Sequence, residues 1–173
     1  MDPVKVVVLE MMILFCLFTD LKYGLIPNII TIPGILTGLY FSASRGNIAG
    51  SLIGIAVTFI VFITMYAVGF MAAGDVKFML AVSALMGEKI SYMAVPLVIL
   101  SGIMISIAIL ISKGTFTAVL KATWNDMRYR ITRFMYERKI SLEKPGIDAK
   151  TYIPYMPSIA LGVNLALFIS SKI

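Results

Sequence analysis

Few side chains in this 173-residue sequence can carry out acid–base chemistry. It contains no histidine and one cysteine, Cys16. This excludes Ser-His triads, Cys-His dyads, histidine-ligated metal sites and cysteine cages for zinc or iron–sulfur clusters. Carboxylates and lysines remain as candidate acids and bases. We therefore expect chemistry that uses no cofactor and no metal ion.

Two aspartates are the strongest candidates, because each adjoins an apolar run. Asp20 follows the run Val4 to Thr19, and Asp75 opens the run that ends near Gly87. Capping of a helix N-terminus is an alternative explanation for Asp75. Asp20 is harder to explain structurally, because a carboxylate at the C-terminal end of an apolar helix meets the negative end of the helix dipole.

If these two carboxylates lie close together, they are the smallest set of groups that aspartyl peptidase chemistry requires. Two neighbouring negative charges repel each other, so the two carboxyl groups have different pKa values. One carboxylate can then activate a water molecule while the other, protonated, donates to the scissile carbonyl oxygen. The dipole argument favours the ionised form of Asp75, so we expect Asp20 to hold the shared proton.

The elements that must position this pair are membrane-spanning helices. With 60% hydrophobic residues, 14% charged residues and a mean hydropathy of +0.95, the sequence is far more apolar than an ordinary soluble domain. A spanning helix needs roughly 20 mostly apolar residues, and about six runs near that size occur. They predict an all-α, polytopic membrane helix bundle that forms one domain over residues 1–173. The expected spans are Val4–Thr19, Asn28–Ala43, Ile48–Phe70, Asp75–Gly87, Tyr92–Ile111 and Ile153–Ser170.

The stretch 113–150 decides the orientation of these spans. It carries nine lysines and arginines against four acidic residues, a net charge of +5 out of +6 for the chain. Loops rich in Lys and Arg stay in the cytoplasm, so this stretch is expected inside. Counting back through alternating spans places Asp20 and Asp75 at the cytoplasmic face of the plasma membrane. Both termini and the turns at 44–47 and 88–91 then lie outside.

The same basic stretch has the pattern of a helix that lies in the membrane surface. Basic residues fill much of one side, and apolar residues recur at helical spacing on the other, which favours binding to membrane lipids. The apolar positions are Phe116, Leu120, Trp124, Met127, Ile131, Phe134 and Met135. An alternative is that the cationic surface positions a protein partner; nucleic-acid binding is not expected. Tyr152 and Tyr155 are typical of an aromatic belt at the membrane interface.

These residues resemble a known family, the type IV prepilin peptidases, which are membrane aspartyl proteases with a Gly-x-Gly-Asp motif. The segment from Asp20 to Asn28 is similar to the family's first aspartate motif. The segment from Gly74 to Lys77 is similar to the second. The stretch from Tyr152 to Gly162 is similar to the proline-rich start of the family's last helix. The resemblance covers nearly the whole chain.

The resemblance implies a substrate and a set of site residues. The substrate is a type IV pilin-like or archaeal flagellin-like precursor with a short basic leader, a glycine before the cut and an apolar helix after it. Asp20 and Asp75 are the implied catalytic pair. The residues expected to bind substrate or to shape the site around the pair are Gly74, Lys77, Lys22, Pro27 and Asn28.

Two features depart from the family's pattern. Ala72 stands where the family usually has the first glycine of its motif, which bears on the backbone conformation before Asp75. The cysteine-rich methyltransferase domain of the longer bacterial members is also missing from this sequence. The chain therefore resembles a short, peptidase-only member, and the resemblance implies no N-methylation of the processed product.

Other protein classes use paired carboxylates as well. In a small proton-coupled transporter or a pilus-assembly scaffold, Asp20 and Asp75 would carry protons or join helices, although a transporter places such groups nearer the bilayer midplane. A presenilin-like intramembrane protease shares the chemistry, but its first motif pairs Tyr with Asp, and Thr19 precedes Asp20 here. Glu10 lies ~15 Å along the first helix from Asp20, too far to join the pair directly.

Overall fold

The computed structural model describes residues 2–112, 124–125, 128 and 154–172, and it confirms the predicted all-α bundle. Every regular element in these residues is a helix. The helices are α1 (Pro3–Tyr23), α2 (Asn28–Ala43), α3 (Ile48–Val68), α4 (Ala73–Met86), α5 (Glu88–Ser112) and α7 (Met156–Lys172). Of the basic stretch 113–150, only Trp124, Asn125 and Arg128 are among the described residues. The surface helix predicted there lies outside the described residues.

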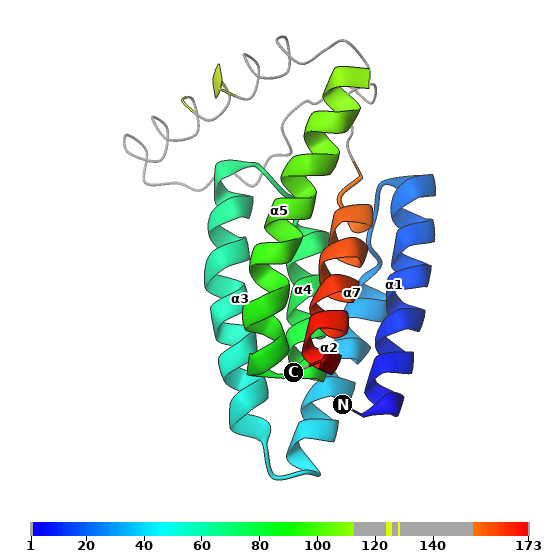
Figure 1. The fold of residues 1–173 in the computed structure, drawn as a ribbon, viewed down its shortest axis with the longest axis vertical. Coiled ribbons are helices and arrows are strands. Elements are labelled where there is room, and N and C mark those ends of the chain that lie inside the picture. Colours follow the sequence, from blue (N-terminus) through cyan, green and yellow to red (C-terminus); the bar gives the residue numbers. More distant parts are fainter. Residues whose placement is uncertain (1, 113–123, 126–127, 129–153, 173) are drawn as a thin grey trace.

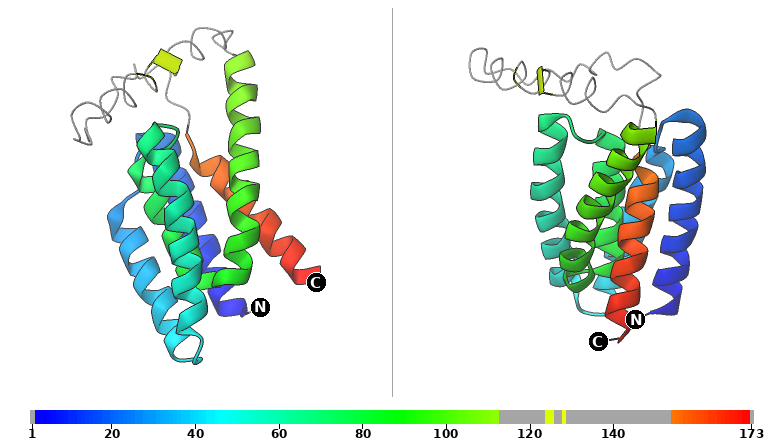
Figure 2. Two further views of the ribbon diagram at one scale, coloured as in Figure 1. Left: turned by 90° about the vertical axis from the view of Figure 1, so that its left-hand side faces the viewer. Right: turned by 45° about the horizontal axis from the view of Figure 1, so that its top comes forward.

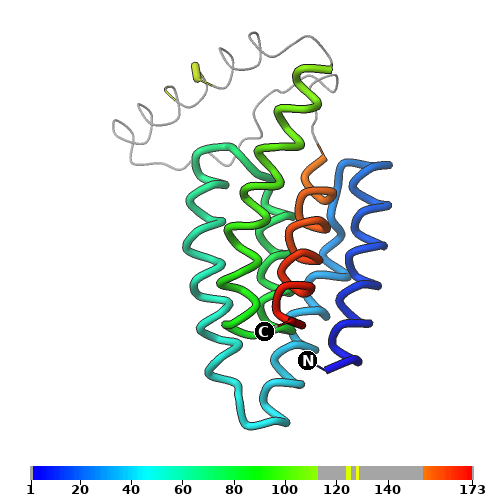
Figure 3. Tube along the Cα trace, viewed as in Figure 1, coloured from blue at the N-terminus to red at the C-terminus, as the bar shows by residue number. Residues whose placement is uncertain are grey.

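The chain runs up and down through a single bundle (Figure 1). α1, α3 and α5 run toward one end, and α2, α4 and α7 run back, as the trace in Figure 3 shows. We call the end where α1, α3 and α5 finish the upper end. Both termini lie at the opposite, lower end in each view of Figure 2. The first and fourth predicted spans therefore present their aspartate-bearing ends to the same side of the bundle.

Several predicted helix boundaries need correction. α3 ends at Val68, α4 begins at Ala73 and α7 covers Met156–Lys172. The two largest changes are at the end of α1 and the start of α5, and a glycine accounts for each. α1 continues beyond Thr19 to Tyr23 and is capped by Gly24, whose φ is 63°, so Asp20 lies inside its last turn. α5 begins at Glu88, so the turn expected at 88–91 is helical. The reversal between α4 and α5 takes place at Gly87 alone, where φ is 78°, a conformation that residues with a Cβ rarely adopt.

α4 is the most enclosed helix of the described bundle. It has 14 residues, and nearly all its side chains from Asp75 to Leu85 are buried, mainly against α2 and α3. The approach of α2 is so close that a Cβ added at Gly38 would lie 2.5 Å from backbone atoms of Ala84 and Leu85. This short helix is thus surrounded by its neighbours, and its N-terminus is held in a fixed place.

Buried hydroxyl groups add polar contacts between α3 and its neighbours. The hydroxyl of Ser51 donates to the Ala84 carbonyl oxygen at 3.0 Å and lies 2.6 Å from that of Ser42. Thr58 and Ser83 pair in the same way at 2.6 Å. Such pairs satisfy polar groups that an apolar surrounding would otherwise leave without partners, so they fix the register of α3 against α4.

The exterior of the bundle is apolar, as a lipid environment requires. Among the described helices, α3 and α5 are long and apolar enough to cross a membrane by length and composition, and α2 and α7 are shorter apolar helices. Large hydrophobic side chains are exposed on the outer faces of the helices, among them Met11, Leu14, Leu36, Ile60 and Met104. An apolar surface of this extent is typical of a membrane protein and not of a soluble monomer.

Candidate active site

Asp20 lies in the last turn of α1 with 2% of its surface exposed. Its carboxylate oxygen Oδ2 accepts a hydrogen bond of 3.1 Å from the backbone N–H of Met156, the first residue of α7. The first N–H groups of a helix have no partners within the helix and form the positive end of its dipole. The expectation that Asp20 faces only an unfavourable helix end is therefore wrong, because a second helix begins against it.

Asp75 is the third residue of α4 and is 4% exposed. Its Oδ2 accepts a hydrogen bond of 3.0 Å from the backbone N–H of Ala72, the residue that caps the helix. This is the side-chain half of a capping box, so the capping role that the sequence indicated for Asp75 is present. Capping does not exclude a role of Asp75 in acid–base chemistry, because the bond to Ala72 orients the carboxylate without neutralising it.

The structure brings Asp20 and Asp75 together. Both carboxylates are buried toward the upper end of the bundle, and they are close enough to interact electrostatically. Each is also oriented by a backbone N–H at the beginning of a helix, Met156 for Asp20 and Ala72 for Asp75. Both aspartates therefore lie at the positive end of a helix dipole, so the dipoles no longer distinguish them. The reason for assigning the shared proton to Asp20 no longer holds.

Gly74 positions Asp75 against the segment that follows α1. A Cβ added at Gly74 would lie 3.1 Å from the Cβ of Ile26, closer than ordinary van der Waals contact. The glycine thus lets the N-terminus of α4 pack on the connection between α1 and α2. Ala72 has φ −85° and ψ 156°, an extended conformation open to any residue, so its departure from the family's glycine causes no backbone strain.

Lys77 and Asn28 join the same two segments at the surface. The ammonium Nζ of Lys77 donates to the side-chain oxygen of Asn28 at 3.0 Å. Pro27 caps α2, and its carbonyl oxygen accepts the N–H groups of Ile30 and Thr31. Pro27 therefore shapes the turn into α2, and Lys77 ties the end of that turn to the helix that carries Asp75.

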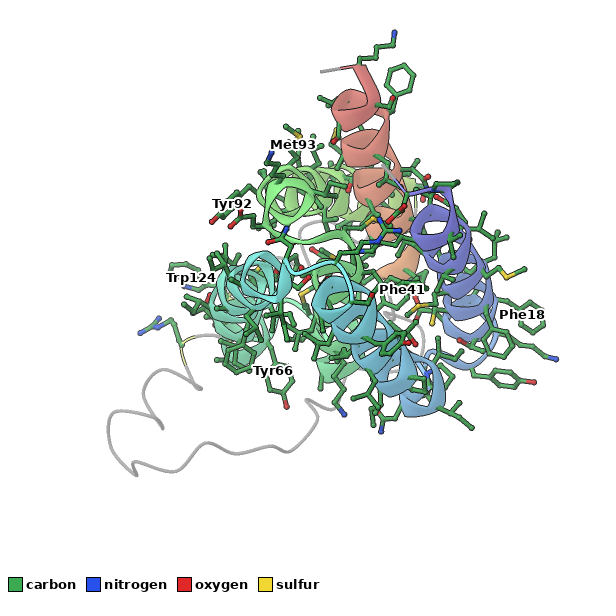
Figure 4. All side chains as sticks on the ribbon, turned by 90° about the horizontal axis from the view of Figure 1, so that it is seen from below. Phe18, Phe41, Tyr66, Tyr92, Met93 and Trp124 are labelled. Atoms are coloured by element: carbon green, nitrogen blue, oxygen red, sulfur yellow. The ribbon has the colours of Figure 1, made fainter. Side chains whose placement is uncertain are left out.

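Lys22 occupies a different position from the other predicted site residues. Its Nζ lies 5.5 Å from the ring centroid of Phe18 and 5.0 Å from that of Tyr23, a cation–π arrangement on the exposed side of α1. Figure 4 shows Phe18 pointing outward from α1, away from the other helices. The ammonium group of Lys22 is thus placed beside aromatic rings at the periphery.

Within the described residues, no three His, Cys, Asp or Glu side chains gather into a possible metal site.

Comparison with known proteins identifies the family. A model of the type IV leader peptidase family matches residues 7–111, more than half of the chain. The chain belongs to the type IV leader peptidase family. No curated protein and no solved structure matches it. The residues that the family model matches include all the predicted site residues of this leader peptidase family member.

The sequence did not point to two residues at the carboxylate pair. Met156 and Tyr155 lie beyond the stretch that matches the type IV leader peptidase family, at the start of α7. Tyr155 was interpreted as part of an aromatic belt, yet its side chain is near enough to Asp75 to interact electrostatically. The signal that could have found Tyr155 is the proline-rich start of the last helix. A backbone N–H donor, as at Met156, cannot be recognised from residue types, because every residue except proline has one.

Proposed function

We propose that this chain is a membrane-embedded aspartyl endopeptidase that removes the leader peptide from type IV pilin-like or archaeal flagellin-like precursors. Asp20 and Asp75 are its catalytic pair. The observation that supports this most directly is the pair itself. Two buried carboxylates from different helices interact electrostatically in a member of a peptidase family.

In the proposed reaction, the two carboxylates hold one proton between them. The ionised carboxylate takes a proton from water while the water oxygen bonds to the scissile carbonyl carbon. The other carboxyl group donates its proton to the carbonyl oxygen. The resulting diol then loses its C–N bond: one carboxyl group protonates the departing nitrogen, and the other carboxylate takes a proton from a diol hydroxyl. The products are an acid and an amine, and the pair again holds one proton.

The hydrogen bonds from Met156 and Ala72 give this pair a fixed geometry. Both donors are backbone N–H groups at the beginning of helices, so they are positioned by α7 and α4 and not by flexible side chains. A preorganised orientation is what proton transfer in the transition state needs. Gly74 contributes by letting α4 pack closely against Ile26.

Access to the pair must accompany binding of the precursor. With exposures of 2% and 4%, Asp20 and Asp75 are almost closed to solvent in the free chain. A peptide bond and a water molecule both have to reach them. In this proposal, the precursor reaches the pair from the upper end of the bundle, and the bound precursor excludes bulk water, which strengthens electrostatic interactions at the reacting groups.

The proposal places the pair at the cytoplasmic face. α5 ends and α7 begins at the upper end of the bundle, so the basic stretch between them leaves and re-enters at the same end as Asp20 and Asp75. The positive-inside rule then assigns that end to the cytoplasm. The precursor's apolar helix would lie in the bilayer with its leader on that side, and the basic stretch would contact anionic lipids there.

Two features favour a peptidase over a transporter or an assembly scaffold. One is membership of a peptidase family. The other is the position of Asp20 and Asp75 in the terminal turns of α1 and α4, whereas transporters hold coupling carboxylates near the midplane.

The test is to combine the purified chain in lipid vesicles with a precursor that has a basic leader, a glycine and an apolar helix. We expect mass spectrometry to find a single cut, directly after the glycine. A precursor without a leader serves as the control and should stay uncut. An intact leader-bearing precursor would contradict the proposal, and cuts within the apolar helix would favour a presenilin-like protease.

A further inference from the structure

Tyr155 connects the carboxylate pair to α5. It precedes α7 directly, and its carbonyl oxygen accepts the N–H groups of Ser158 and Ile159 at 3.0 and 3.2 Å. The next residue, Met156, donates its N–H to Asp20. The peptide group between Tyr155 and Met156 is therefore held at its carbonyl oxygen by the first turn of α7 and at its N–H by the carboxylate of α1.

The side chain of Tyr155 packs against α5. Its hydroxyl oxygen and ring lie directly against Gly102 of α5, where an added Cβ would clash with both the hydroxyl and the Cζ atom. Gly102 is buried, so α5 provides a flat backbone surface on which the ring rests. A glycine at this position permits the contact, and the contact fixes where the hydroxyl lies.

The fixed hydroxyl is near Asp75 and has hydrogen-bonding capacity to spare. Tyr155 and Asp75 are close enough to interact electrostatically. The Tyr155 side chain is half-buried. Among the described residues no buried side-chain oxygen lacks a hydrogen-bond partner, and no described residue accepts a bond from this hydroxyl, so its oxygen is open to water or to a bound substrate. A hydroxyl placed beside a catalytic carboxylate is suited to pair with a bound substrate.

We propose that the Tyr155 hydroxyl is a further catalytic group, which donates a hydrogen bond to the oxygen of the scissile carbonyl as negative charge develops there. No proton leaves Tyr155. The carbonyl oxygen accepts the proton of the aspartate pair, and the tyrosine O–H supplies a second donor that lowers the energy of the transition state. This inference rests on the proposed function, because it assigns a role within that reaction.

The first test is Tyr155→Phe, assayed with the leader-bearing precursor in vesicles. Removing a donor that acts only on developing charge should lower kcat by about tenfold or more and leave KM near its original value. Tyr92→Phe, an exposed position at the lower end of α5, is the matched control and should change neither constant. An unchanged kcat in Tyr155→Phe, or an effect on KM alone, would overturn the proposal.

A second variant keeps the test valid if Tyr155→Phe alters packing. Gly102→Ala places a methyl group against the Tyr155 hydroxyl and should displace it, which lowers kcat in the wild-type background. In the Tyr155→Phe background, the same methyl group should cause little further loss, because the donor is already absent. Equal losses in both backgrounds would show that the hydroxyl is not the group responsible.

The aspartate variants separate this proposal from the proposed function. If Asp20→Asn and Asp75→Asn lose cleavage while Tyr155→Phe cleaves normally, the role of Tyr155 is wrong and the peptidase assignment stands. If the aspartate variants cleave normally, the proposed catalytic pair itself fails, whatever Tyr155→Phe does.

Discussion

The backbone N–H of Met156 donates a hydrogen bond of 3.1 Å to the carboxylate of Asp20, which ties the beginning of α7 to the end of α1. Asp75 receives the corresponding bond from Ala72 at the beginning of α4. Each of the two aspartates therefore has a buried carboxylate that is oriented by a backbone donor at a helix N-terminus. The bundle can hold two carboxylates close together because each is partly compensated in this way.

The contact between Gly74 and Ile26 predicts a contrast between two neighbouring positions. Gly74→Val should lower the rate of leader removal by about 10²-fold, because a displacement of about 1 Å is enough to misplace a catalytic group. Ala72→Gly should leave the rate unchanged, since the extended backbone at Ala72 suits both residues. The rates are measured with one precursor under identical conditions. Equal activity of Gly74→Val and wild type would contradict the positioning role of Gly74.

The Lys77–Asn28 hydrogen bond should be detectable as an energetic coupling. A double-mutant cycle with Lys77→Met and Asn28→Ala should give ~0.5–1 kcal/mol in the free energy of unfolding, as expected for an exposed bond from a charged donor. Lys22→Met is the control, because Lys22 lies over Phe18 and Tyr23 instead. Its effect should add to that of Asn28→Ala. Strict additivity of the Lys77 and Asn28 changes would show that their bond contributes nothing.

The close approach of α2 to α4 predicts a strong effect at Gly38. Gly38→Val should reduce the free energy of unfolding by ~1–3 kcal/mol, because its side chain would overlap the backbone at Ala84 and Leu85. Leu36→Met, on the exposed face of the same helix, should be nearly neutral. Unfolding in lipid bicelles measures both. Similar stabilities for the two variants would mean that α2 and α4 can separate without cost.

The orientation of the bundle can be tested by cysteine labelling, for which this sequence is well suited. The single natural cysteine, Cys16, is buried, so the unmodified chain should label poorly. A cysteine at Arg133 should react only when the reagent reaches the cytoplasm. A cysteine at Lys89, exposed at the lower end, should react from outside. The reverse pattern would place Asp20 and Asp75 on the wrong side for the proposed substrate.

Much of the fold could be predicted from the sequence, because apolar runs of a given length specify helices. α2 was predicted with its observed boundaries. The C-terminal end of α1 and the start of α5 were not, because they depend on positive φ angles at Gly24 and Gly87 that no apolar pattern reports.

The features of the candidate site also divide into those that the sequence could indicate and those that it could not. Asp20 and Asp75 could be found because charged groups beside apolar runs are conspicuous. The bond from Met156, the packing of Gly74 on Ile26 and the position of Tyr155 depend on contacts between distant segments, which single-sequence patterns do not encode.

The most direct test of the central proposal is the cleavage rate of Asp20→Asn and Asp75→Asn. Asparagine keeps an oxygen that can accept the N–H of Met156 or Ala72, so both variants should fold and insert normally. Glu10→Gln on α1 and Glu88→Gln at the lower end remove one negative charge each and serve as matched controls. We predict no detectable leader removal by either aspartate variant and wild-type rates for both controls. Substantial cleavage by Asp20→Asn or by Asp75→Asn would contradict the proposal that the two carboxylates act as a catalytic pair.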